Sequence, residues 1–199
     1  MVNSESKVII KNSFQKESET GPKFSYFKRP ISNTTPFLTV GLFDVYDYIK
    51  QEYAKESCLQ LRSLVDKKNT SAFKSKNFDY VTFGGEFSSR KDEDLIKPSG
   101  LMCFDFDDVK NIDKLKNQLM NDEYFEPQMI FTSPGGKGVK WVVKMPQGQA
   151  DYGTCYQAIS NYVFKTYGVE ADKSCKNISR ACFLPHDSDV YINQKYNII

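Results

Sequence analysis

Apolar residues recur at helical spacing in four segments of the chain, residues 44–49, 54–65, 112–119 and 152–167. Short apolar runs, several of them rich in β-branched and aromatic residues, lie between and after these segments, at residues 80–83, 101–107, 129–131, 139–145 and 181–184. Such runs are typical of buried strands. The order of helices and strands predicts an α+β fold, in which a mixed, mostly antiparallel sheet has helices packed on it.

The N-terminal part of the chain is the least regular. Residues 1–36 are polar, with two short β-like pieces at residues 8–10 and 24–27. We therefore predict an N-terminal arm over residues 1–36, partly β or disordered, followed by a single domain over residues 37–199. A chain of 199 residues is long enough for one hydrophobic core. Its 40% of apolar and 26% of charged residues exclude wholesale disorder.

Charge and cysteine content narrow the class of protein. A net charge of +2 creates no overall field for a nucleic acid or a membrane, so any such role depends on local clusters. The single histidine, His186, and the lack of a Cys-x-x-Cys pair exclude a Cys/His zinc site. The five scattered cysteines are typical of buried small side chains in a reducing compartment. With no apolar run of signal-peptide or membrane-span length, we predict a cytoplasmic protein without a membrane partner.

Two carboxylates share one face at the end of the strand predicted over residues 101–107. Side chains two positions apart point the same way, so Asp105 and Asp107 project together while Phe106 points into the core. The two negative charges repel each other unless a cation lies between them, and a hard divalent ion such as Mg²⁺ fits that position. The alternative is an acidic surface loop, continued by Asp108, that simply follows a strand.

A glycine- and lysine-rich loop follows the next strand along the chain. Its glycines allow backbone N–H groups to approach a ligand closely, and its lysines are suited to an anion. The relevant residues are Ser133, Gly136, Lys137, Gly138 and Lys140. The loop lacks the Gly-Lys-Ser/Thr ending and the following helix of a Walker loop. The alternative is a plain turn that joins two strands.

A third polar element places an acid and an arginine beside the last predicted strand. Asp172 lies in a basic loop, and Arg180 enters the strand at residues 181–184. An arginine there can fork onto a phosphate, or it can pair with Asp172 as part of the scaffold. Together with the acidic pair and the glycine loop, these residues suit a metal-bound polyphosphate, in which carboxylates hold ions while cations neutralise the phosphates.

These motifs, in this order, resemble those of the archaeo-eukaryotic primase-polymerase superfamily, and more narrowly the VirE-type N-terminal domain carried by bacterial mobile elements. The resemblance covers about residues 44–193. It rests on Phe104-Asp105-Phe106-Asp107, on Ser133-x-x-Gly136-x-Gly138-Val139-Lys140, on Asp172 with Arg180, on Gly85-x-Phe87-x-x-Arg90, and on Ser99-Gly100-Leu101.

The resemblance implies a core of RRM-like strands and a nucleotidyltransferase that acts in replication of a mobile element. Asp105 and Asp107 would be catalytic, and Mg²⁺ or Mn²⁺ would bind Asp105, Asp107 and Asp172. An NTP or dNTP would be held by Ser133, Gly136, Lys137, Gly138, Lys140, Arg180 and Arg90. A single-stranded DNA template and a helicase domain or protein are the implied partners.

Lys140 departs from the pattern of the superfamily, which usually has a histidine at this position. A lysine still neutralises phosphate, but near pH 7 it cannot act as a neutral imidazole donor. The departure therefore bears on polymerase activity more than on nucleotide binding. If Lys140 takes over the phosphate contact, its ammonium is expected to point toward the acidic pair, with Val139 and Trp141 facing the other way.

Two other functions fit parts of the sequence. The run from Asp105 to Val109 matches the signature of haloacid dehalogenase-like phosphatases, with Asp105 as nucleophile and Asp107 as acid/base. That signature normally opens the fold, whereas here about half of the chain precedes it. The second alternative is a catalytically inactive replication accessory domain, which binds single-stranded nucleic acid by stacking bases on exposed aromatic residues.

Overall fold

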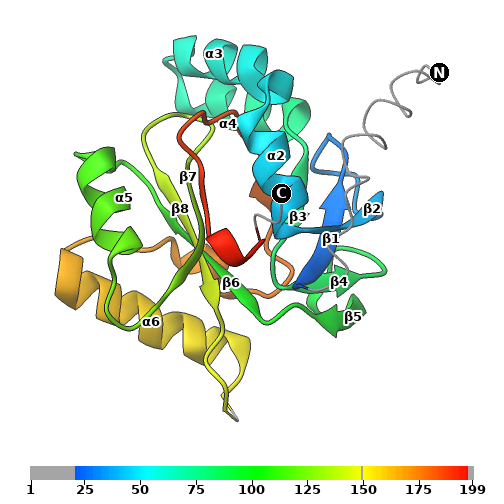
Figure 1. Cartoon of the computed structure of the whole chain (residues 1–199). Helices are drawn as coiled ribbons and strands as arrows, with labels where there is room; N and C mark the ends of the chain where they lie inside the picture. The colour runs from blue at the N-terminus through cyan, green and yellow to red at the C-terminus, as the bar shows by residue number, and fades with distance from the viewer. Residues whose placement is uncertain (1–20, 149, 197–199) are drawn as a thin grey trace.

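The computed structural model describes residues 21–148 and 150–196 (Figure 1). The α-helices within these ranges are α2 (Leu42–Lys50), α3 (Lys55–Ser63), α4 (Lys67–Asn77), α5 (Ile112–Met120) and α6 (Tyr152–Tyr167). The strands are β1 (Lys23–Phe27), β2 (Leu38–Gly41), β3 (Tyr80–Thr82), β4 (Gly85–Phe87), β5 (Leu95–Pro98), β6 (Leu101–Phe106), β7 (Pro127–Thr132), β8 (Val139–Lys144), β9 (Cys182–Phe183) and β10 (Tyr191–Ile192). The predicted α+β class is confirmed.

The strands divide between two four-stranded sheets and a hairpin. The first sheet has the order β2-β1-β3-β9, the second has the order β10-β7-β8-β6, and β4 pairs with β5. Throughout the described residues, the registered strand pairs are antiparallel. The order of the elements predicted one mixed sheet with some parallel strand pairs. The described residues instead form separate antiparallel sheets.

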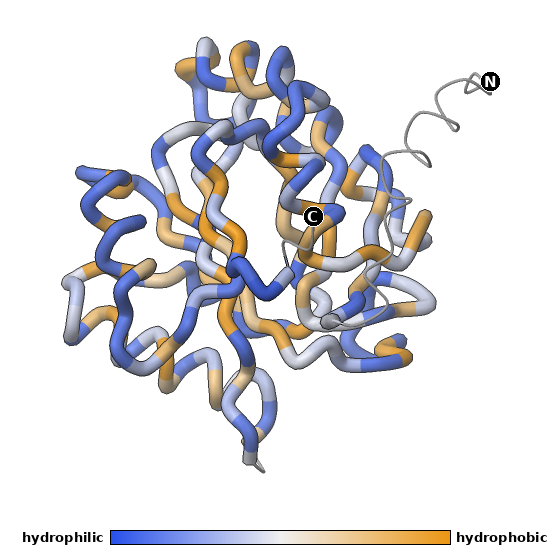
Figure 2. The backbone as a smooth tube through the Cα atoms, in the orientation of Figure 1, coloured by the Kyte–Doolittle hydropathy of each residue, from blue (hydrophilic) through white to orange (hydrophobic). Residues whose placement is uncertain are grey.

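Two hydrophobic cores hold these layers together. The first core lies between the two sheets and includes the buried faces of α2 and α3. The second lies between the other face of the second sheet and the helices α5 and α6. Figure 2 shows the apolar residues concentrated along the strands, with mostly hydrophilic residues over the outer helices. Because side chains alternate along a strand, β6 sends Phe104 and Phe106 into the second core and Asp105 toward the first sheet.

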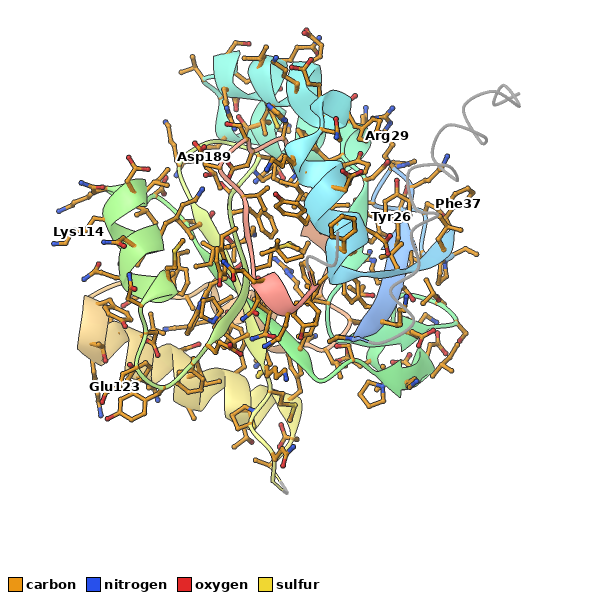
Figure 3. The ribbon with its side chains drawn as sticks, viewed as in Figure 1. Tyr26, Arg29, Phe37, Lys114, Glu123 and Asp189 are labelled. Atoms are coloured by element: carbon orange, nitrogen blue, oxygen red, sulfur yellow. The ribbon has the colours of Figure 1, made fainter. Side chains whose placement is uncertain are left out.

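The segment predicted as an arm contributes an interior strand. β1 lies between β2 and β3, and its residues Phe24, Tyr26 and Phe27 are completely buried. Tyr26 packs on Phe37 with ring centroids 6.4 Å apart (Figure 3), and its hydroxyl donates a 2.5 Å hydrogen bond to Asp79. Residues 21–36 thus belong to the folded domain. The β-like piece predicted at residues 8–10 lies outside the described residues.

α4 and the shortest strands have little signal in the sequence. None of the residues of α4 is buried, so the helix has no apolar face to reveal its period. Its start is marked only by Asp66, whose side chain accepts a 2.8 Å hydrogen bond from the backbone N–H of Lys68.

No helix in the described part of the chain has the length and apolar character to cross a membrane.

Candidate metal and nucleotide site

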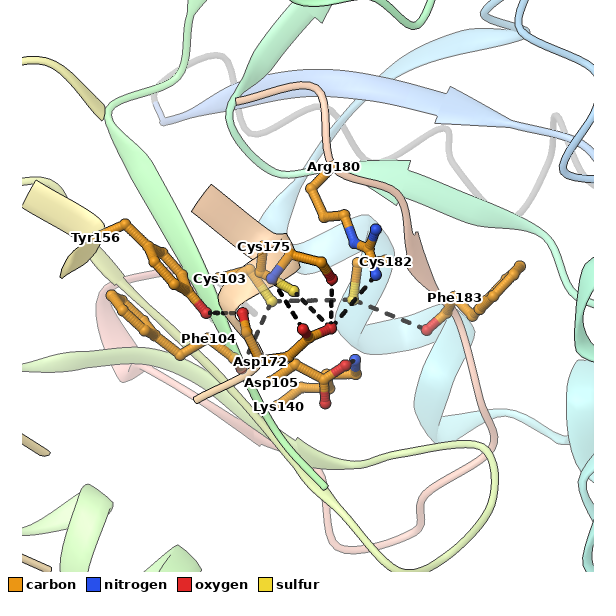
Figure 4. Close-up of polar contacts among 11 residues, drawn as sticks. Cys103, Phe104, Asp105, Lys140, Tyr156, Asp172, Cys175, Arg180, Cys182 and Phe183 are labelled. Atoms are coloured by element: carbon orange, nitrogen blue, oxygen red, sulfur yellow. Dashed lines mark hydrogen bonds and ion pairs between the residues drawn. The ribbon is translucent and has the colours of Figure 1, made fainter. Parts of the chain in front are cut away.

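Asp105 and Lys140 lie side by side on the face of the second sheet that is turned toward the first sheet. They are direct cross-strand partners in the register of β6 and β8. Their side chains project to the same side, and the ammonium of Lys140 forms an ion pair with Oδ2 of Asp105 (Figure 4). Val139 and Trp141 lie in the second core, on the opposite face. The orientation predicted for Lys140 is therefore confirmed.

The ion pair is buried, and one of its oxygens is left without a partner. The side chains of Asp105 and Lys140 are only 13% and 11% exposed. Burial acts to lower the pKa of Lys140, but the Asp105 carboxylate and nearby thiols raise it overall, so the lysine is charged. Oδ1 of Asp105 is buried, and none of the residues that the structure describes forms a hydrogen bond with it. A buried carboxylate oxygen in this state is costly, and a donor or a cation at that point would remove the cost.

Asp172 and Cys175 lie close to the Asp105 carboxylate. The backbone N–H of Asp172 donates a 2.8 Å hydrogen bond to the backbone oxygen of Asp105, which fixes the Asp172 loop on β6. The Asp172 carboxylate caps the 3₁₀ turn Lys173–Lys176 through Ser174. One ligand atom from each of Asp105, Asp172 and Cys175 lies within 4.8 Å of the other two. Carboxylate oxygens at this spacing, together with the unpartnered Oδ1, fit a divalent cation.

The Cys175 thiol was not among the residues selected from the sequence. Burial is the largest cause that raises its pKa to about 12, so a cation that bound the sulfur would have to displace its proton. The sequence does not indicate that Cys175 lies near Asp105, because only the turn that Asp172 caps brings the two residues together.

Asp107 stands at the exposed rim of the site, where the glycine loop wraps the end of β6. Partial desolvation and, next, the charge of Asp105 raise the pKa of Asp107. The backbone N–H of Ser133 donates a 2.8 Å hydrogen bond to the oxygen of Gly138, which closes the loop. A Cβ on Gly138 would lie 2.6 Å from the backbone oxygen of Phe106 and 3.4 Å from Oδ1 of Asp107. The loop can therefore approach the backbone of β6 this closely only with glycine at position 138.

Gly138→Ala is expected to lower the free energy of unfolding by about 1–3 kcal/mol, because the new methyl group meets backbone rather than a flexible side chain. Gly135→Ala is the matched control, since a Cβ there has no atom within 4 Å among the described residues. Urea unfolding of the two variants measures the difference. Equal losses in both variants would contradict the close approach of Gly138 to β6.

Two basic residues of the site were missed because they come from distant helices. Nε of Arg62, in α3, donates a 3.2 Å hydrogen bond to the backbone oxygen of Pro134 and covers Gly136. The charge of Lys74, in α4, lowers the pKa of Asp107 against the larger effects of desolvation and Asp105. The lysine content of α4 was the only available signal, and it did not indicate where the helix packs.

Of the remaining predicted residues, Arg180 and Lys137 lie at the site, whereas Arg90 is engaged elsewhere. Arg180 lies 3.4 Å from Oδ2 of Asp172, so it forms the scaffold pair and also borders the site. Lys137 is exposed on the loop, and its backbone oxygen accepts from Val109. Arg90 instead donates to the hydroxyl of Tyr80 and to a backbone oxygen in the turn after β1. The structure thus places Arg90 as a support for that turn.

Two hollows adjoin the acidic residues. A small cavity of about 10 Å³, enough for about one water molecule, is lined by Asp105, Lys140 and Arg180, together with three cysteines. A wider groove of about 450 Å³ runs from Asp107 along the start of α5, and Lys114 of that helix lines it. Its size is in the range of small-molecule sites.

Comparison with known proteins gives one finding. A family model described as BT4734-like, N-terminal domain, matches residues 72–192. No curated protein and no solved structure matches the chain. The matched segment runs from within α4 to the end of β10 and contains both acids of the cluster, the glycine loop and Lys140.

Proposed function

We propose that this chain, which belongs to the family described as BT4734-like, N-terminal domain, binds a divalent metal ion with a nucleoside triphosphate and acts as a primase-polymerase-type nucleotidyltransferase. The observation that carries the proposal is the cluster of Asp105, Asp172 and Cys175, in which Oδ1 of Asp105 is buried and has no hydrogen-bond partner among the described residues. The reaction class rests on the resemblance of the motifs to the primase-polymerase superfamily.

The acidic residues would hold the metal ion. Asp105 and Asp172 offer carboxylate oxygens from the inner side of the site, and Asp107 offers a third from the rim. Of the two ions expected, Mg²⁺ takes oxygen ligands, so the neighbouring sulfur of Cys175 favours Mn²⁺. When bound, the ion would supply positive charge to the reacting phosphate and to the pyrophosphate that leaves.

The cations around the site would hold the phosphates. Lys140 and Arg180 each already neutralise one carboxylate, so they are fixed beside the place where a metal-bound phosphate would lie. Lys137 is exposed on the glycine loop, and the groove that Asp107 lines along α5 has room for the rest of the nucleotide. Arg90 is left out of this set, because its guanidinium is engaged at the turn after β1.

The proposed biological role is replication of a mobile element. It includes a single-stranded DNA template, a helicase domain or protein as partner, and a reducing, cytoplasmic location. The basic residues of α4, with Lys74 next to the site, favour a nucleic-acid backbone on that side.

A second candidate function is binding without catalysis. The Lys140 ammonium neutralises Oδ2 of Asp105, so this oxygen is less available to a metal than in a site that has an imidazole at this position. This ion pair favours an accessory domain that binds metal-bound nucleotide or DNA without turnover. Incorporation of labelled nucleotide into a primed or unprimed single strand, with Mn²⁺ present, distinguishes the two functions.

The phosphatase alternative has less support from the fold. A dehalogenase-like enzyme requires a doubly wound, mostly parallel sheet. The strand that carries Asp105 pairs antiparallel with β8, as do the other strand pairs found in residues 21–148 and 150–196.

We expect an NTP to bind in the presence of Mn²⁺ and to lose most of its affinity in EDTA, as measured by calorimetry. Asp107→Asn is expected to weaken binding about tenfold, since it removes a charge-assisted contact from an exposed position that the fold does not need. Asp113→Asn is the matched control, because Asp113 is also exposed and does not line the groove that Asp107 lines.

Two results would contradict this site. NTP binding that is unchanged by EDTA would remove the metal from the proposal. Equal losses in Asp107→Asn and Asp113→Asn would show that general surface charge, rather than a ligand at the rim, governs the affinity.

A further inference from the structure

Three thiols converge on the small cavity beside Asp105. Cys103, Cys175 and Cys182 all line it, although they come from β6, from the turn after Asp172 and from β9. Figure 4 shows Cys103 and Cys182 directed at each other across this space, and their sulfur atoms are 3.9 Å apart. All five cysteines of the chain are free thiols in the structure.

The position of the two strands allows this pair to close. β6 is an edge strand of the second sheet and β9 is an edge strand of the first. In these sheets the two strands are not joined to each other by backbone hydrogen bonds. A disulfide requires the sulfurs to approach to about 2.05 Å with the Cβ atoms about 3.8 Å apart. Two sulfurs already in contact reach that geometry by rotation of the side chains and a small shift between the sheets.

The other cysteines are engaged differently. The sulfur of Cys58 accepts a 3.3 Å hydrogen bond from the backbone N–H of His186, and Cys155 packs in the second core. Cys175 directs its thiol at the Asp172 carboxylate, 3.7 Å away. The contact between Cys103 and Cys182 thus singles out one pair for oxidation.

We propose that Cys103 and Cys182 are a site of reversible oxidation, at which a hydroperoxide converts the two thiols into an intramolecular disulfide. In the first step one thiol attacks the peroxide, becomes a sulfenic acid and releases one water. The second thiol then attacks the sulfenic sulfur, the S–S bond forms, and a second water leaves. The thiols lose two electrons and two hydrogens in total, and one H₂O₂ is reduced to two H₂O. A small dithiol restores both thiols and is itself oxidised to a disulfide.

The size of the cavity selects the oxidant. Cys182 is only 4% exposed, and the cavity beside it has a volume of about 10 Å³. Hydrogen peroxide has only one more oxygen atom than water, so a small movement of the lining side chains admits it, whereas a bulky aromatic disulfide reagent cannot enter. The pair is therefore expected to react with H₂O₂ while the folded protein resists the bulky reagent at these positions.

The disulfide would act on the neighbouring acid and arginine. Asp105 lies two residues after Cys103 on the same face of β6, and Arg180 lies two residues before Cys182. Drawing the sulfurs together narrows the cavity that Asp105 and Arg180 line. Oxidation is therefore expected to weaken binding of metal-bound nucleotide, a consequence that rests on the proposed function.

Treatment of the full chain with H₂O₂, followed by intact mass measurement and peptide mapping, tests the proposal. The expected result is a loss of the mass of two hydrogen atoms, a single linked pair of peptides containing Cys103 and Cys182, and full reversal by dithiothreitol. Cys103→Ser and Cys182→Ser should lose the link, and Cys155→Ser should keep it. Because the peptide map is made on the unaltered protein, the result does not depend on the folding of any variant.

Three outcomes would overturn the proposal: a link that involves Cys175, sulfinic acid on either cysteine without a link, or no reaction before the chain unfolds. The nucleotide measurement is read separately. If the link forms and the reduced protein binds no NTP, the oxidation site stands and the proposed function fails. If the link forms and both forms bind NTP equally, the effect of the disulfide on the site is disproved.

Discussion

Lys140→Met is expected to lower the free energy of unfolding by about 3–5 kcal/mol, because the change leaves the buried Asp105 carboxylate without the ammonium that neutralises it. Asp105→Asn should cost a similar amount, since it leaves the lysine charged and buried. The double variant Asp105→Asn/Lys140→Met should regain most of the loss, because neither of the two residues then carries a buried charge. Urea unfolding of the four proteins completes the cycle.

An exposed ion pair provides the control for this cycle. Lys55 and Glu52 form a pair in which the side chains are 46% and 72% exposed, so Lys55→Met should change stability by about 0.5 kcal/mol or less. Additive losses at Asp105 and Lys140 would show that the two side chains do not depend on each other. The double variant also separates stability from binding, since it should fold and yet bind metal-bound NTP more weakly than the wild type.

Asp187→Ala is expected to cost about 3–5 kcal/mol for a related reason at a different place. Oδ2 of Asp187 accepts a 2.8 Å hydrogen bond from the ammonium of Lys116 in α5 and a 2.7 Å hydrogen bond from the backbone N–H of Thr132. Thr132 immediately precedes the glycine loop, so the carboxylate also fixes where that loop begins. The exposed Asp189 (Figure 3) is the control, and Asp189→Ala should have little effect.

The stabilisation by Asp187 depends on pH in a defined direction. Burial acts to raise the pKa of Asp187, but the bonds from Lys116 and Thr132 outweigh it and lower the pKa overall. A depressed folded-state pKa means that the stabilisation is present above the unfolded value of about 3.9. It is lost as the pH falls through the folded value. The stability difference between wild type and Asp187→Ala should therefore be full at pH 7 and shrink below about pH 4. A difference that is constant across this range would contradict the assignment.

The parts of the fold that were predicted from the sequence are those with a local pattern. Alternation along residues 101–107 separated Asp105 from Phe104 and Phe106, and the same rule set Lys140 on the opposite face from its strand neighbours Val139 and Trp141. The helical spacing over residues 112–119 and 152–167 corresponds closely to α5 and α6. In each case the buried face belongs to a single helix or strand. The period of its apolar residues can therefore be read from the sequence without knowing which element packs against it.

The parts that could not be predicted depend on contacts between distant segments. β1 lies in a polar stretch of sequence, and its central place follows only from pairing with β3, more than fifty residues away. Arg62 reaches Pro134 across 72 positions, and Cys103 meets Cys182 across 79. Arg90 matched a motif, yet the turn that engages its guanidinium had no signal of its own.

The position of β3 has a consequence for how the chain folds. β3 is flanked in its sheet by β1, from near the start of the described chain, and by β9, from near residue 183. The sheet is therefore complete only after residue 183 has left the ribosome. Strands that are so far apart in the sequence pair slowly, because closing the long loop between them costs conformational entropy before the pairing stabilises the sheet. Asp172 and Arg180 thus reach Asp105 only late, so the acidic site is assembled after the helices and hairpins that depend on local contacts.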